Sequence, residues 1–105
     1  MYVTTTFHAR PPPQVLAGLV DLRTLNVSQN GGVTDRCVPL LAALPVLETL
    51  NLSNTNMTPA AVPALQRLLS LTSLALYSTA IPPSAAVAIK GSLPRLLTLG
   101  LDEAE

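Results

Sequence analysis

The sequence predicts an α/β fold built from about four repeated strand-and-return units, and three observations support this prediction. The first is a six-residue pattern, L-x-x-L-x-(L/V), which occurs at Leu22, Leu47, Leu71 and Leu96. The second is its spacing, because successive copies begin 25, 24 and 25 residues apart. The third is the composition: 49% of the 105 residues are hydrophobic but only 3% are aromatic. The core must therefore be assembled from repeated aliphatic side chains.

Each copy of the pattern predicts a short strand that lies parallel to the next. In L-x-L, the two apolar residues point to one face of a strand and the residue between them points to the other. One repeat cannot bury its apolar face alone, so the stability must come from stacking. The pairs expected to stack are Leu25 and Val27, Leu50 and Leu52, Leu74 and Leu76, and Leu99 and Leu101.

Turn-like residues and a second apolar segment follow each strand and predict a return on the other side of the sheet. Thr34 and Thr58 are suited to cap short helices. Pro39 and Pro63, five residues later in each case, predict short or late-starting helices, because proline cannot donate the backbone hydrogen bond of a helix interior. A longer helix is predicted over Ser84–Lys90, ended by the glycine that follows it.

These motifs resemble those of leucine-rich repeat proteins, in particular the intracellular F-box-associated (cysteine-containing) and ribonuclease-inhibitor-like subtypes. The resemblance rests on the four leucine patterns together with V-T-D at Val33–Asp35 and M-T-P at Met57–Pro59. It implies a leucine-rich repeat solenoid: a curved parallel β-sheet with short helices or irregular segments on its convex side. The turn position that is often Asn or Cys in the family is Asn30 here, and Thr55 and Thr79 in the next two repeats. A threonine hydroxyl there is expected to satisfy neighbouring backbone groups.

We expect one domain over residues 1–105, forming a segment of a longer solenoid. Stepping back one period places Tyr2 and Phe7 in the core positions of Val27 and Val33, so the chain is expected to begin within a repeat. The alternative is a short repeat protein that covers its open ends by self-association. The expected repeats are 1–21 (partial), 22–46, 47–70, 71–95 and 96–105 (partial).

Charge and motif content argue against several classes of function. Six basic and six acidic residues cancel and neither sign forms a run, so we expect neither a nucleic-acid partner nor a membrane partner. His8 and Cys37 are each the single residue of their type, and no glycine-rich phosphate motif is present. We therefore expect no catalytic, cofactor-binding or metal site, and no enzyme.

Cys37 is expected to be a small buried hydrophobic residue. With no partner cysteine in the chain and no signal-peptide-like run at its start, it favours a cytoplasmic, intracellular location. A secreted or surface location stays open if the chain is a fragment.

The resemblance also implies a binding surface, because leucine-rich repeat proteins commonly bind protein partners on their concave strand face. Tyr77 stands out on that face, since aromatic residues are scarce in the chain and tyrosine is enriched among binding hot spots. The alternatives are a merely solvated strand face, or contacts through the convex side that carries Arg36, Arg67 and Lys90. Carried over to this sequence, the concave face comprises Thr24, Asn26, Ser28, Thr49, Asn51, Ser53, Ser73, Ala75, Tyr77, Thr98, Gly100 and Asp102.

The function expected from these features is that of a non-catalytic protein-interaction module or scaffold. Three alternatives remain open from the sequence. The chain could be a structural spacer in a cytoskeletal or multi-protein assembly, or the substrate-recruiting arm of a ubiquitin-ligase adaptor. It could also be a glycosylated segment of a cell-surface receptor, for which Asn26, Asn51 and Asn56 provide N-x-[ST] sequons.

Overall fold

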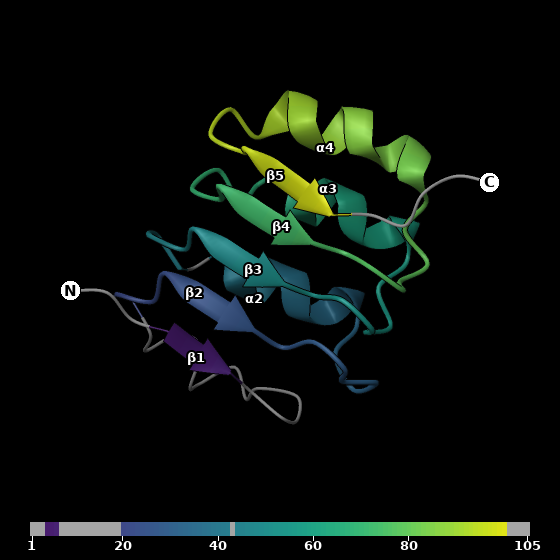
Figure 1. Cartoon of the computed structure of the whole chain (residues 1–105), viewed down its shortest axis with the longest axis horizontal. Coiled ribbons are helices and arrows are strands. Elements are labelled where there is room, and N and C mark those ends of the chain that lie inside the picture. The colour runs from purple at the N-terminus through teal and green to yellow at the C-terminus, as the bar shows by residue number, and fades with distance from the viewer. Residues whose placement is uncertain (1–3, 7–19, 43, 101–105) are drawn as a thin grey trace.

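Five short strands form one parallel sheet among the residues that the computed structural model describes, which are 4–6, 20–42 and 44–100. Their order in the sheet is their order in the chain, so each strand pairs with the next one along the sequence (Figure 1). The predicted α/β class is thereby confirmed. The strands are β1 (Thr4–Thr6), β2 (Thr24–Asn26), β3 (Thr49–Asn51), β4 (Ser73–Ala75) and β5 (Thr98–Gly100).

The register of the sheet follows the spacing of the leucine pattern. Leu25 lies opposite Leu50, Leu50 opposite Leu74, and Leu74 opposite Leu99. The central leucine of each strand therefore falls in one continuous row, as the periodicity predicts.

The first pairing departs from that period. Thr5 lies opposite Leu25, a step of 20 residues, whereas the later steps are 24 or 25. One period before Val27 is therefore occupied by a different residue than expected, since the sequence-based alignment assumed a full-length repeat there. Tyr2 and Phe7, which that alignment placed in the core, lie outside the described residues.

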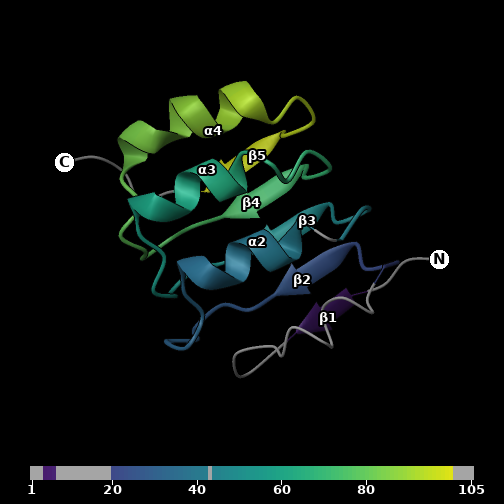
Figure 2. The same cartoon turned by 180° about the vertical axis from the view of Figure 1, so that it is seen from behind.

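Each return consists of a 3-10 turn followed directly by a short α-helix, and all three helices lie on the same face of the sheet (Figure 2). As predicted, Thr34 caps the first return by accepting from the backbone N–H of Arg36 at 3.4 Å, and Thr58 caps the second by accepting from Ala60 at 3.2 Å. The prolines at the first turn of α2 and α3 accompany helices of only four residues, as expected. The returns are η1 (Asp35–Cys37) and α2 (Val38–Leu41), η2 (Pro59–Ala61) and α3 (Val62–Leu65), and η3 (Pro83–Ala85) and α4 (Ala86–Ser92).

The helix α4 begins and ends later than predicted. Ser84 belongs to the preceding 3-10 turn, and Gly91 lies inside the helix instead of ending it. The helix stops where Leu93 adopts an extended conformation, with φ −112° and ψ 92°. The residue before a proline is disfavoured in the helical region, so Pro94 ends the helix and the glycine does not.

The core lies between the sheet and the three helices. Leu25, Leu50 and Leu74 expose at most 1% of their surface, and the last member of this row, Leu99, is only partly buried. Cys37 is buried at 3% exposure, as expected for a small hydrophobic residue.

The turn after each strand is closed by the side chain that the family comparison singled out. The amide nitrogen of Asn30 donates to the backbone carbonyl three residues earlier at 3.0 Å. The hydroxyls of Thr55 and Thr79 donate to the equivalent carbonyls at 2.6 and 2.9 Å. The expectation that threonine satisfies backbone groups in place of asparagine is therefore confirmed.

Candidate functional site

The candidate site is the face of the sheet opposite the helices, which we call the strand face. It is formed by the strand residues that alternate with the buried leucines, together with the first residues after each strand. Figures 1 and 2 show that no helix of the described chain covers it. Strands β2, β3 and β4 each show the same pattern, with a buried central residue between two half-buried neighbours.

Asparagine side chains mark the polar half of this face, over β2 and β3. The Oδ1 atom of Asn26 accepts from the backbone N–H and the hydroxyl of Ser28, at 2.9 and 2.6 Å. The Oδ1 atom of Asn51 accepts from the backbone N–H of Ser53 at 3.0 Å. These bonds hold each amide against the end of its own strand, and its nitrogen remains a donor that a partner molecule could use.

Tyr77 dominates the other half of the face, and 49% of its surface is exposed. A Cβ atom added to Gly100 would lie 2.6 Å from two carbons of the Tyr77 ring. The ring therefore packs across the neighbouring strand β5, in space that only a glycine at this position leaves open. The backbone of Tyr77 is also fixed, because its N–H donates to the hydroxyl of Ser53 at 3.0 Å.

The chemistry of the face changes from polar to apolar along the sheet. One row of side chains runs Asn26, Asn51, Ala75, Gly100 across β2 to β5. The row beside it begins with an ion pair and ends with Leu97, which is 86% exposed. A partner would meet amides and a compensated charge pair at one end, and small residues flanked by exposed apolar side chains at the other.

The charge pair at the polar end joins neighbouring strands. Arg23 and Glu48 approach to 3.2 Å, and their side chains are 35% and 42% exposed. At that exposure the pair is screened by solvent and leaves the strand face nearly neutral.

The structure places most of the predicted site residues on the strand face. Tyr77 and Thr98 are exposed, and the predicted residues of β2, β3 and β4 are half-buried, as is Ser28. Ser53 differs from the expectation: it is 7% exposed, because its hydroxyl accepts the N–H of Tyr77 and the tyrosine lies beside it. Asp102 lies outside the described residues.

Leu97 belongs to this face but was not among the predicted residues. The fourth leucine pattern reads L-L-T-L-G-L, with leucine where the earlier copies carry Arg23, Glu48 and Thr72. That departure from three polar residues was the signal in the sequence. It was missed because an additional leucine in a leucine-rich pattern reads as a core residue.

Other predicted features fall elsewhere or remain untested. His8 lies outside the described residues. In the described part of the chain, no group of three or more His, Cys, Asp or Glu side chains could hold a metal ion. Of the three sequons, Asn56 is exposed, and its amide nitrogen donates to the carbonyl of Gly31 at 2.5 Å.

No helix within residues 20–42 or 44–100 is both long and apolar enough to cross a membrane.

No family model matches the chain, and no curated protein matches it. Among solved structures, the chain is similar to one in the structure of the Mex67:Mtr2 subunits from Chaetomium, with a TM-score of 0.66 and 23% sequence identity. The similarity covers 91% of this chain but 63% of that chain, so this chain spans less than two thirds of its length. At this identity the similarity shows the fold alone.

Proposed function

We propose that this chain is a leucine-rich repeat domain that binds a partner protein through its strand face, without catalysis and without a cofactor. One observation carries the proposal: Tyr77 is half exposed on an otherwise small-residue surface and packs over Gly100 of the next strand. Such an aromatic side chain, exposed yet held by its own fold, has the properties of a binding anchor.

The repeat assignment is supported by features that recur at the same position of successive units. The strands pair in chain order with leucine opposite leucine. Each turn is closed by a side chain at an equivalent position, namely Asn30, Thr55 and Thr79. The similar solved chain comes from a structure of two different subunits, Mex67 and Mtr2, which agrees with a role in binding another protein.

Packing over Gly100 favours affinity because it reduces what Tyr77 loses on binding. An immobilised flexible side chain costs about 0.5–1.5 kcal/mol of ordering at an interface. A ring that already packs against its neighbouring strand loses less of that freedom. The amide nitrogens of Asn26 and Asn51 add hydrogen-bond donors that can fix the orientation of the partner.

The experiment is affinity capture with the full chain, followed by measurement of Kd between the purified captured protein and variants. Tyr77→Ala removes the anchor and is expected to weaken binding by about 2 kcal/mol, or about 30-fold. Gly100→Ala keeps the tyrosine but places a Cβ 2.6 Å from its ring. The ring must swing away, so this variant is expected to weaken binding to a similar degree while the fold persists.

Val87→Ala is the matched control, because Val87 is 81% exposed but lies on α4, on the opposite side of the sheet. Circular dichroism establishes that every variant is folded. The proposal is refuted if a specific partner binds the Tyr77 and Gly100 variants as tightly as the unmodified chain. Loss of binding in the Val87 variant alone would place the interface on the helix side.

A further inference from the structure

A groove runs between neighbouring return segments on the helix side of the molecule, away from the strand face. Its first part is a hollow of about 280 Å³. Pro39 and Ala42 line it from the α2 side, and Ala60, Pro63 and Arg67 line it from the side of η2 and α3. Apart from Arg67, this lining is made of small apolar side chains.

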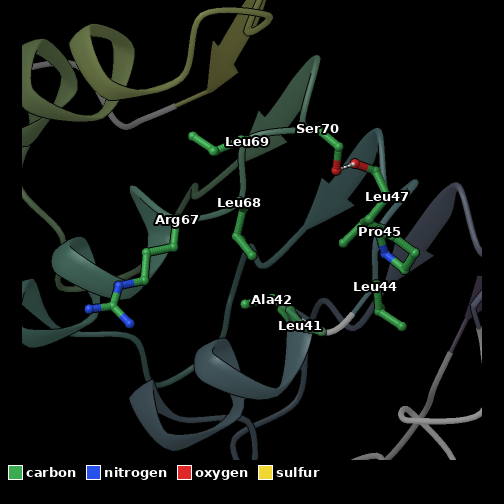
Figure 3. A pocket seen from close by; sticks show the side chains of 9 residues that line it. All are labelled: Leu41, Ala42, Leu44, Pro45, Leu47, Arg67, Leu68, Leu69 and Ser70. Carbon is green, nitrogen blue, oxygen red and sulfur yellow. Dashed lines mark hydrogen bonds between the residues drawn. The ribbon is translucent and has the colours of Figure 1, made fainter.

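A second hollow, of about 190 Å³, shares Ala42 and Arg67 with the first, so the two meet at these residues. Leu44 and Pro45 line its far side, and the 57% exposed Leu69 stands at its edge. Figure 3 shows the Arg67 side chain extending away from Leu44 and Pro45. One cation therefore stands where two apolar hollows meet.

The charge of Arg67 is not compensated by the described part of the chain. Its side chain is exposed, and no described carboxylate pairs with it. Neither hollow is lined by an aspartate or a glutamate. The described carboxylate of the neighbouring return, Asp35, is already bound by the backbone N–H and the hydroxyl of Thr58. An occupant of the groove would thus meet an unpaired guanidinium, which favours a carboxylate.

The size of the hollows decides between a small molecule and a peptide. Pockets for small molecules usually enclose about 300–1,000 Å³. Each hollow lies below that range, as expected for a site that takes individual apolar side chains. In an extended peptide, residues i, i+2 and i+4 point to the same side.

We propose that this groove binds an extended segment of a partner protein with the pattern apolar-x-acidic-x-apolar. The two apolar side chains occupy the two hollows, and the carboxylate between them pairs with Arg67. This interaction is independent of the strand face, because its residues lie on the helix side of the sheet (Figure 2).

The test uses the full chain and two blocked pentapeptides, acetyl-Leu-Ser-Glu-Ser-Leu-amide and the same peptide with glutamine in place of glutamate. Binding is followed by chemical-shift changes in NMR spectra, which report affinities down to the millimolar range. The glutamate peptide is expected to bind more tightly than the glutamine peptide by about two- to fivefold, the range of a partly exposed ion pair. In Arg67→Gln this preference is expected to disappear, while the affinity for the glutamine peptide stays the same.

Two further variants separate charge from shape. Arg36→Gln removes another exposed cation of the helix side that lines neither hollow, and the preference for the glutamate peptide is expected to persist. Ala42→Phe places a large side chain at the exposed point shared by both hollows and is expected to abolish binding of both peptides. The proposal is overturned if neither peptide binds at about 5 mM, if Arg67→Gln keeps the preference, or if the shift changes map to the strand face.

Discussion

Replacing Thr55 by valine removes one hydroxyl from the turn after β3 and leaves the shape of the side chain nearly unchanged. Thr55 is 6% exposed, and its hydroxyl donates to the carbonyl of the buried Leu52 at 2.6 Å. Leaving a buried polar group without its partner costs about 1–3 kcal/mol. The methyl group that replaces the hydroxyl regains up to about 0.8 kcal/mol by burial. The expected net loss is about 1 kcal/mol in the free energy of unfolding.

Urea denaturation followed by far-UV circular dichroism measures this loss. In a thermal scan, 1 kcal/mol corresponds to a fall of about 4–8 °C in Tm for a domain near this size. Thr49→Val is the matched control, because Thr49 is half-buried on the strand face and its change is expected to stay within about 0.5 kcal/mol. Thr55→Asn tests the equivalence with Asn30 and is expected to recover most of the stability. If Thr55→Val is as stable as the unmodified chain, the turn is not held by this hydrogen bond and the reasoning is wrong.

Two further predictions follow from burial and exposure. Leu50→Ala, in the middle of the sheet at 1% exposure, is expected to lose about 2–5 kcal/mol in urea denaturation, and the partly buried Leu99 is expected to lose less when changed in the same way. Equal losses at the two positions would contradict the view that the row of leucines is less well covered at β5. Arg23→Ala is expected to change stability by less than about 1 kcal/mol, since its ion pair is partly exposed, and a thermal scan at high salt should remove even that difference.

The repeat is the part of the fold that could be predicted in most detail. The row formed by Leu25, Leu50, Leu74 and Leu99 follows from the spacing alone, because equivalent residues of stacked units must lie opposite one another. Cap positions were also predictable, since a threonine cap acts on a backbone N–H only two residues away.

Errors arose where one local signal competed with another. Gly91 and Pro94 both offered an end for α4, and the proline prevailed because it restricts the backbone of Leu93, whereas glycine only permits an end. The first strand pairing was misplaced because its step of 20 residues breaks the period of the later units.

The candidate site was predictable as a face but not as a surface with particular chemistry. Alternation along each strand showed which residues point away from the core, and the structure bears this out for β2, β3 and β4. Alternation says nothing of how far a side chain reaches over the neighbouring strand. Ser53 was therefore expected to be open, although the backbone of Tyr77 binds its hydroxyl.

The leucine periodicity by itself determined that this protein is a stack of parallel strands with short returns, because only stacking can bury an apolar face that recurs every 24 or 25 residues. The tertiary structure alone decided that Tyr77 packs over Gly100 and that two apolar hollows meet at Arg67. These features join residues about 23–25 positions apart. Their geometry depends on the directions and sizes of side chains in adjacent units, which a repeating pattern does not specify.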